Sequence, residues 1–213
     1  MSRALIFVNG DLTDPGAARA IVRADDVVLA ADGGARHALS LGIIPSAIIG
    51  DLDSLSPAEV REFADMDVHI LRFPQSKNET DLELALAHAL KAGYSPIIIL
   101  AALGGRLDQT LGNIALLAGP EALQVDVRLD DGLTEAFFVT RKALILGKSG
   151  DTVALIPWGG PVEGVSTDAL AYPLNKETLY PYSTRSISNQ MLAESAQVSL
   201  KTGLLLCVHI RKK

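Results

Sequence analysis

The sequence is poor in cysteine and in aromatic residues. Its single cysteine, Cys207, cannot form a disulfide within the chain, and only 5% of the 213 residues are aromatic. Cys207 lies in the apolar run from Leu204 to Ile210, where we interpret it as a buried structural thiol. Because 48% of the residues are hydrophobic, the chain can still bury a sizeable core, made mainly of aliphatic side chains.

Long apolar runs and an excess of positive charge are also missing. The apolar runs have the length of strands, well short of the ~20 residues that a membrane helix needs. The formal charge of −6 argues against nucleic acid as a partner, because binding it requires clustered Lys and Arg. The N-terminal residues lack the long apolar region of a secretory signal. We therefore expect a cytoplasmic protein that binds neither membranes nor nucleic acids.

The first half of the chain alternates strand-like and helix-like segments. Capping boxes mark two helix starts, at Ser56 to Glu59 and at Thr80 to Glu83. Because helices between strands favour right-handed crossovers, we predict a doubly wound, mostly parallel α/β domain over residues 1–130. The predicted strands are 4–8, 27–31, 47–49, 68–73 and 96–100, and the predicted helices are 15–22, 35–41, 57–64 and 81–91.

The pattern changes after about residue 120. Short strand-like segments separated by Gly, Pro, Asn or Ser follow, without further strand-helix alternation. This favours a small antiparallel β-sandwich or barrel, and we predict a sandwich over residues 131–213. The strand-like segments are 135–140, 142–146, 152–156, 169–174 and 204–210.

Two aspartates one residue apart, Asp51 and Asp53, directly follow the predicted strand 47–49. The carboxyl edge of a parallel sheet opens a crevice, and a carboxylate pair there can hold Mg²⁺ against a phosphate. Asp81 and Asp108 lie at further junctions between strands, loops and helices, which share that edge. Carboxylates that converge repel one another unless a cation neutralises them. The four aspartates therefore predict a Mg²⁺ site, although turn chemistry alone also explains many such loop acids.

Several of the charged candidates also have a plain structural interpretation. An acid at Asp81 or Asp108 is favoured by the helix dipole whatever its function. Arg106, beside Asp108, could hold a phosphate bidentately. Lys77 lies in a polar loop where a lysine is ordinarily just solvated. The four histidines have no ligand-like spacing, and we interpret them as structural.

The segment Asp32-Gly33-Gly34 lies between a predicted strand and a predicted helix. Glycines there would let backbone N–H groups approach a phosphate at the helix N-terminus. A tight turn is the plainer interpretation, since the segment matches neither the dinucleotide fingerprint nor the P-loop.

Taken in order over nearly the whole chain, these motifs resemble the thiamine pyrophosphokinase family. The resemblance implies an N-terminal domain that binds ATP and Mg²⁺, a sandwich that contributes to thiamine binding, and a homodimer with active sites between subunits. The motifs that carry it are Asp32-Gly33-Gly34, Gly50-Asp51-Leu52-Asp53-Ser54, Lys77 with Thr80-Asp81, Gly104-Gly105-Arg106-Leu107-Asp108-Gln109-Thr110 and Ser188-Asn189.

The resemblance also assigns roles by position. The implied metal ligands are Asp51, Asp53, Asp81 and Asp108. The residues implied in catalysis are Asp51, Asp53, Asp81 and Arg106. The implied ATP contacts are Asp32, Gly33, Gly34, Lys77, Arg106, Asp108 and Gln109. The implied thiamine contacts are Tyr172, Ser188 and Asn189, although core packing is an equally ordinary role for a tyrosine in a sandwich.

The chain departs from the family pattern in several places. Gln109 and Gln190 stand where the bacterial relatives usually have His and Glu; glutamine keeps the hydrogen bonding but removes the titratable group at both positions. Residues 165–170 replace a common Thr-x-Gly-Leu pattern, which makes specificity for thiamine less secure than the nucleotide site.

The implied reaction transfers pyrophosphate from ATP to thiamine, giving thiamine diphosphate and AMP. Two other classes stay open from the sequence. A metal-dependent phosphatase would also use an Asp-x-Asp pair, with the first aspartate attacking phosphorus. A non-catalytic thiamine or nucleotide sensor could keep the pocket and lose the metal cluster.

Overall fold

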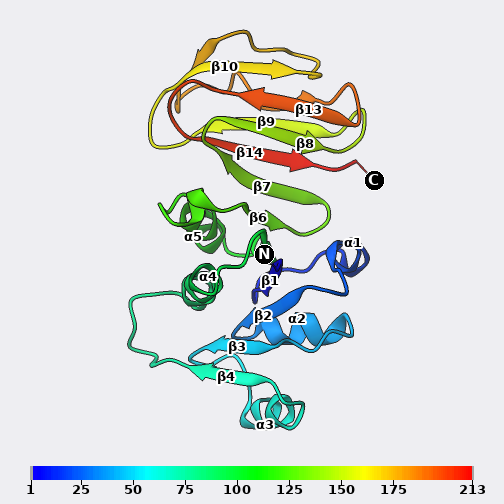
Figure 1. Ribbon diagram of the computed structural model, residues 1–213, viewed down its shortest axis with the longest axis vertical. Coiled ribbons are helices and arrows are strands. Elements are labelled where there is room, and N and C mark those ends of the chain that lie inside the picture. Colours follow the sequence, from blue (N-terminus) through cyan, green and yellow to red (C-terminus); the bar gives the residue numbers. More distant parts are fainter. Residues whose placement is uncertain (1, 213) are drawn as a thin grey trace. The chain divides into compact units, whose positions relative to one another are not determined.

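In the computed structural model (Figure 1) the chain folds into two compact units that divide between Gly132 and Leu133. The structure describes residues 2–212. The predicted division after residue 130 lies beside the observed one. No helix within residues 2–212 is long and apolar enough to cross a membrane.

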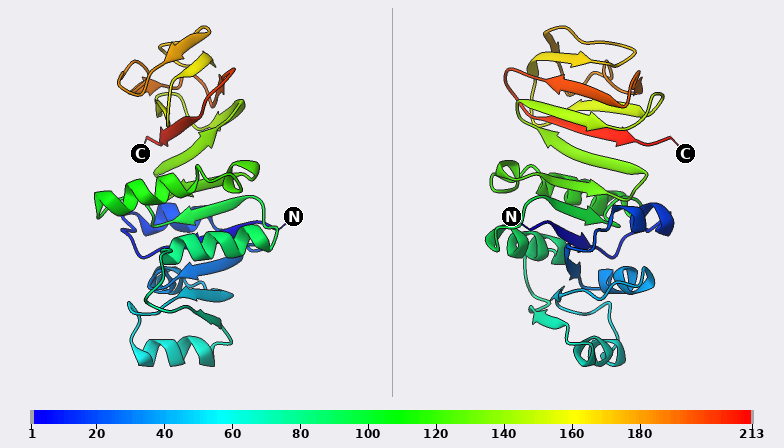
Figure 2. Two further views of the ribbon diagram at one scale, coloured as in Figure 1. Left: turned by 90° about the vertical axis from the view of Figure 1, so that its left-hand side faces the viewer. Right: turned by 45° about the vertical axis from the view of Figure 1, so that its right-hand side comes forward.

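The first unit contains a parallel sheet with the strand order β6-β5-β1-β2-β3-β4. The helices α1 and α2 cover one face, and α4 and α5 cover the other (Figures 1 and 2). The elements are β1 (Ala4–Phe7), α1 (Pro15–Ile21), β2 (Val27–Ala31), α2 (Gly34–Ser40), β3 (Ala47–Gly50), α3 (Pro57–Asp65), β4 (His69–Arg72), α4 (Asp81–Lys91), β5 (Ile97–Leu100), α5 (Leu107–Leu116), the 3₁₀ helix η1 (Ala122–Gln124) and β6 (Val127–Asp130).

The core of the first unit is aliphatic, as the scarcity of aromatic residues requires. The strands β1 and β5 are buried along their whole length, as expected for central parallel strands. On one face Leu5 and Phe7 pack with Ala18 of α1 and Ala38 of α2. These small helix residues let both helices lie close to the sheet.

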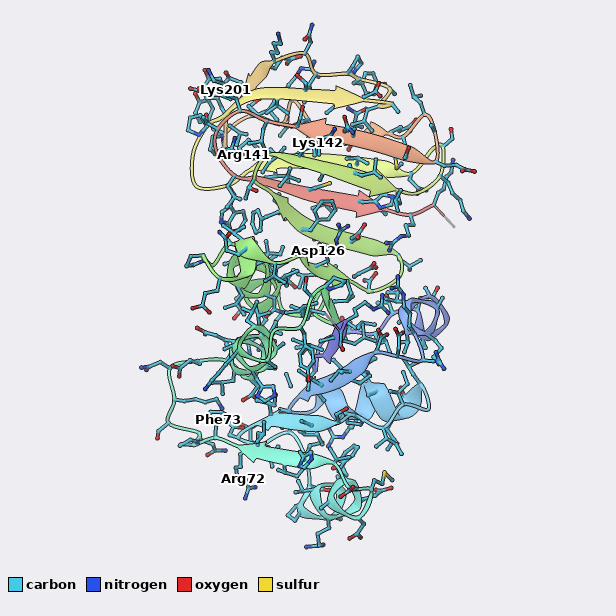
Figure 3. The ribbon with its side chains drawn as sticks, in the orientation of Figure 1. Arg72, Phe73, Asp126, Arg141, Lys142 and Lys201 are labelled. Atoms are coloured by element: carbon cyan, nitrogen blue, oxygen red, sulfur yellow. The ribbon has the colours of Figure 1, made fainter. Side chains whose placement is uncertain are left out.

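The direction of the chain reverses in this sheet. From β1 it moves outward through β2 and β3 to β4, and then returns to the other side of β1 with β5. Ligands of open α/β sheets bind outside the carboxyl ends of the strands at such a reversal. At the outer edge, β4 ends at Arg72, and the loop that begins at Phe73 (both labelled in Figure 3) leads to α4.

The predicted α/β fold class is confirmed, and so are the predicted strands and helices of this unit, with small differences at their ends. The capping box at Ser56 is complete, because Ser56 and Glu59 each accept from the other's backbone N–H. The Thr80 hydroxyl caps α4 by accepting from the N–H of Glu83 at 3.1 Å. Neither α5 nor β6 was among the elements predicted from local patterns.

The second unit is an antiparallel β-sandwich, as predicted. Its strands follow the orders β12-β9-β14-β7 and β11-β10-β13-β8, and a common core includes Phe137, Val165 and Cys207. Cys207 is buried, in agreement with its interpretation as a structural thiol. The strands are β7 (Thr134–Val139), β8 (Lys142–Leu146), β9 (Thr152–Pro157), β10 (Val162–Asp168), β11 (Glu177–Leu179), β12 (Asn189–Gln190), β13 (Ser195–Ser199) and β14 (Leu205–Ile210).

One predicted strand, 169–174, is wrong. The strand of this region is β10, which ends at Asp168, and Ala169 then adopts a φ of 58°. That conformation breaks an extended strand, and Pro173 has no N–H to donate to a neighbour. Only an isolated bridge between Leu170 and Met191 remains of the expected pairing.

Candidate functional site

A cavity of about 690 Å³ opens at the carboxyl ends of the strands of the first unit. Its walls come from the segments that follow β1, β2, β3, β4 and β5, and from α4 and α5. Eight residues predicted from the sequence line it, namely Asp32, Asp51, Asp53, Lys77, Asp81, Arg106, Asp108 and Gln109.

The backbone is strained at this edge of the sheet. Three residues other than glycine have positive φ within two residues of the ends of β2, β3 and β5: Asp32 (45°), Leu52 (66°) and Ala101 (56°). Such conformations cost energy and cluster at active sites and ligand clamps. The strain therefore points to the same edge as the cavity.

The carboxylates of Asp32, Asp51 and Asp53 form the tightest acidic group. One oxygen from each lies within 4.8 Å of the others. Asp51 Oδ1 accepts from the N–H of Asp53 at 3.1 Å, and Asp32 Oδ2 accepts from the N–H of Ser54 at 3.2 Å. The sequence had placed Asp51 and Asp53 among the metal ligands, but Asp32 only among the nucleotide contacts.

Asp32 is the buried member of this group, with 4% of its surface exposed. Its Oδ1 atom is buried and accepts no hydrogen bond from residues 2–212. A buried polar atom without a partner is costly and needs a reason. Carboxylate oxygens are the ligands that Mg²⁺ takes. The three side chains therefore fit a hard divalent cation.

Lys77 brings Asp81 next to this group. Its Nζ atom lies 2.7 Å from Asp51 Oδ2 and 2.8 Å from Asp81 Oδ1. The hydrogen bond from Lys77 lowers the pKa of Asp51. Burial raises the pKa of Asp81, although Lys77 acts in the opposite direction. Burial also opposes the charge of Lys77, but its hydrogen bonds to the two carboxylates raise its pKa.

Gly50, the last residue of β3, makes room for Asp81. Its φ is 151°, and a Cβ atom there would lie 2.7 Å from Asp81 Oδ1. Only glycine combines this backbone conformation with such a close approach. The close approach of Asp81 to the end of β3 therefore depends on the missing side chain.

Arg106 and Asp108 lie along the same cavity but pair with each other. Nε and Nη2 of Arg106 donate to the two Asp108 oxygens at 3.1 and 2.6 Å, and both side chains are exposed. The hydrogen bond from Arg106 lowers the pKa of Asp108. Among residues 2–212, Asp108 is not part of the close carboxylate group.

Gly33 and Gly34 are explained by packing at the start of α2. A Cβ atom on Gly33 would lie 2.6 Å from Asn9 Cγ, and one on Gly34 would lie 2.1 Å from the carbonyl oxygen of Phe7. Asn9 itself lines the cavity and donates to Ser54 Oγ at 3.4 Å. Sequence reasoning missed Asn9, and only its position directly after β1 could have suggested it.

In the second unit, the predicted thiamine contacts Tyr172 and Asn189 are neighbours. Asn189 is buried, its Oδ1 accepts from the N–H of Tyr172 at 2.9 Å, and its Nδ2 donates to the Tyr172 carbonyl at 2.7 Å. Tyr172 itself is 63% exposed, so the core-packing interpretation is wrong. Ser188, next to Asn189, is exposed and has a φ of 60°.

A doubly wound sheet with carboxylates, a lysine and an arginine at its carboxyl edge is typical of enzymes that act on phosphate groups with a metal ion. The family model for the thiamin pyrophosphokinase catalytic domain matches residues 18–129, and the model for the vitamin B1 binding domain matches residues 142–205. The chain belongs to the thiamin pyrophosphokinase family.

Individual relatives agree with this membership. The thiamine pyrophosphokinase of Bacillus subtilis is 29% identical over 179 residues, which cover 83% of this chain and 84% of that protein. A crystal structure of the B. subtilis enzyme matches with a TM-score of 0.89 and 26% identity over the whole of both chains. A family protein from Enterococcus faecalis matches with a TM-score of 0.86 and 26% identity, again over both whole chains.

Proposed function

We propose that the protein transfers the pyrophosphoryl group of ATP to the hydroxyl oxygen of thiamine, giving thiamine diphosphate and AMP. Family membership supports the reaction. The observation that carries the proposal is the group formed by Asp32, Asp51 and Asp53, with one buried oxygen left without a partner, in a cavity on the sheet edge where nucleotides bind.

In bonds, the thiamine oxygen attacks the β-phosphorus of ATP. The bond between this phosphorus and the α–β bridging oxygen breaks, AMP leaves with that oxygen, and the hydroxyl proton passes to a carboxylate of the site. Such transfers depend on alignment and on charge neutralisation rather than on a covalent protein intermediate.

The first unit supplies these two requirements. We assign metal binding to Asp51 and Asp53 together with Asp32, and keep Asp81 and Asp108 as the outer acids of the same cavity. When bound, Mg²⁺ would neutralise and orient the phosphate oxygens. Lys77 holds a positive charge beside the carboxylates.

Arg106 offers a planar pair of donors at the other side of the cavity. In exchange for Asp108 it would bind a phosphate bidentately. Gln109, next to Asp108, lines the same cavity and is an uncharged donor and acceptor for ATP.

We assign the thiamine contacts to the second unit. The exposed ring of Tyr172 offers a face on which an aminopyrimidine can stack. The side-chain amide of Asn189 accepts from the N–H of Tyr172 and donates to the Tyr172 carbonyl. Its contribution is therefore to hold the loop that carries Tyr172 in place. The exposed hydroxyl of Ser188 is the remaining polar contact.

A homodimer with active sites between subunits and a cytoplasmic location complete the proposal. The family resemblance supports the dimer. Light scattering should give twice the mass of one chain, and a fully active monomer would contradict the dimer. Cell fractionation tests the location.

The two rival classes are less well supported. A phosphatase with Asp51 as nucleophile would have no use for a vitamin B1 binding domain, which the chain matches over residues 142–205. A sensor that had lost its metal site would not need the three carboxylates that the first unit gathers.

Phosphorus NMR of the products tests the reaction itself. Purified protein with Mg²⁺, ATP and thiamine should yield AMP and thiamine diphosphate. A parallel reaction with thiamine monophosphate checks the acceptor. ADP with thiamine monophosphate as products would show ordinary kinase chemistry and overturn the proposal.

A further inference from the structure

A chain of hydrogen bonds connects α2 to the loop that carries Asp51 and Asp53. It starts at Arg36, whose Nη2 donates to the carbonyl oxygen of Ser54 at 2.6 Å. The same guanidinium donates from Nε and Nη2 to the two oxygens of Glu59 on α3, at 2.5 and 2.9 Å. Arg36 therefore joins α2, α3 and the loop between β3 and α3.

Glu59 is itself held in place. Its Oε2 accepts from the N–H of Ser56 at 2.8 Å, and its own N–H donates to the Ser56 hydroxyl at 3.3 Å. The hydrogen bond from Arg36, followed by those from Ser56, lowers the pKa of Glu59 to about 2. The acceptor for Arg36 is therefore fixed by a capping box and stays ionised throughout the neutral range.

Ser54, at the other end of the connection, contacts two members of the carboxylate group. Its N–H donates to Asp32 Oδ2 at 3.2 Å, and its hydroxyl donates to Asp53 Oδ1 at 3.3 Å. The carbonyl oxygen of the same residue is the one that Arg36 holds. A shift of this residue would therefore move hydrogen-bond donors of both carboxylates.

We propose that Arg36 is a positioning residue for the metal site, which acts through Ser54 and does not touch the metal or the substrates. The inference rests on the proposed function, in which Asp32 and Asp53 share a cation. Asp32 precedes α2, whereas Asp51 and Asp53 precede α3. A bidentate link from α2 to α3 therefore sets the spacing of carboxylates that come from two different strands.

Positioning explains the Arg36–Glu59 pair better than a role in stability alone. Arg36 and Glu59 are 47% and 31% exposed, and ion pairs at such positions contribute little to stability. A planar guanidinium fixes direction as well as distance, because its donors form a rigid fork. Partners behind a metal ligand typically alter metal affinity about 10- to 100-fold when they are removed.

The test compares Arg36→Met with Arg61→Met, which makes the same chemical change at an exposed residue of α3. Mn²⁺ alone is the probe, titrated into the full-length protein and followed by electron paramagnetic resonance. Arg36→Met should weaken Mn²⁺ binding about 10-fold. Arg61→Met should bind Mn²⁺ like the unchanged protein.

Three further variants separate the geometry of the Arg36–Glu59 pair from its charge. Glu59→Gln keeps an oxygen that can accept from Ser56 but loses the bidentate pair, so it should weaken Mn²⁺ binding in the same direction. The double variant with Arg36→Met should lose no more than Arg36→Met alone, since both changes break one link. Arg36→Lys restores the charge without the fork and should recover only part of the affinity.

A steady-state readout distinguishes positioning from damage. In Arg36→Met the Mg²⁺ concentration for half-maximal rate should rise, while the rate at saturating Mg²⁺ stays close to that of the unchanged protein. Unaltered Mn²⁺ affinity, even with lowered thermal stability, would overturn the inference and leave the proposed function standing. If the unchanged protein itself binds no Mn²⁺, the metal site fails and the inference fails with it.

Discussion

Each unit of the molecule gathers acidic side chains, but the two groups are satisfied to different degrees. In the second unit, buried Asp151 accepts from the N–H groups of Lys148 and Lys212 at 2.9 and 2.8 Å, and its Oδ2 lies 3.0 Å from His209 Nε2. In the first unit, Asp32 is equally enclosed, yet its Oδ1 accepts no hydrogen bond from the described residues.

The two acidic groups also differ in the backbone around them, which is regular beside His209 and strained at Asp32. The strand β14, which carries His209, pairs regularly with β7 and β9 along its whole length. Asp32 instead adopts a positive φ, in line with similar residues after β3 and β5. A buried acid whose oxygens are all hydrogen-bonded stabilises a fold, whereas a buried oxygen without a partner, on a residue with strained backbone, marks a binding site.

The largest effect should come from breaking the first group. Asp51→Asn removes one charge from the proposed metal site but keeps the size of the side chain, so the protein should fold and lose turnover by about 10²- to 10³-fold. Activity against Mg²⁺ concentration measures this, with circular dichroism as the control for folding. Near-normal turnover at low Mg²⁺ would remove Asp51 from the metal site.

Breaking the acidic group of the second unit should lower stability and leave Mn²⁺ binding unchanged. Both ring nitrogens of His209 face carboxylates, Glu135 Oε2 at 3.4 Å and Asp151 Oδ2 at 3.0 Å, so both carry protons when the acids are ionised. His209→Gln leaves buried charge poorly paired, and stability should fall by about 3 kcal/mol. Urea unfolding measures the loss. Weakened Mn²⁺ binding by the folded variant would contradict the division of roles.

A smaller effect is expected at the exposed ring of Tyr172. Loss of stacking in Tyr172→Ala should raise KM for thiamine by about 10-fold at most, while KM for ATP stays unchanged. Tyr172→Phe keeps the ring and should remain close to the unchanged protein. Equal changes in both KM values would place Tyr172 outside the thiamine site.

The smallest effect is a gentle pH dependence of stability. Burial lowers the pKa of His209, but its hydrogen bonds to Glu135 and Asp151 outweigh this and raise it above 6.5. A raised folded-state pKa gives stability that is present below about pH 6.5 and is lost as the pH rises through the folded value. Urea unfolding between about pH 6 and about pH 8 should show this decline, and His209→Gln should abolish it.

Much of the fold followed from local patterns. The capping residues Ser56 and Thr80 marked the starts of α3 and α4, because these helices are determined by neighbours in sequence. Local patterns failed at residues 169–174, where a short apolar segment suggested a strand. Ala169 instead adopts a positive φ directly after β10, and the apolar composition of the segment gives no sign of this conformation.

The site was harder to predict than the fold. The spacing of Asp51 and Asp53 was enough to predict them as site residues. Asp32 joins them because β2 and β3 are paired, and the N–H of Asp32 donates to the carbonyl oxygen of Ile49 at 3.0 Å. Which strands pair cannot be predicted from the sequence of either strand alone. Asp108 was predicted as a metal ligand but lies outside the carboxylate group, because Arg106 donates hydrogen bonds to both of its oxygens.

Gly50 makes the end of β3 unusually sensitive to mutation. Any side chain at this position would press on the carboxylate of Asp81, because a Cβ atom there would lie 2.7 Å from Asp81 Oδ1. A random mutational screen would therefore report position 50 among the residues needed for activity, although glycine has no side chain to offer to a substrate. At this position the property under selection is an empty volume.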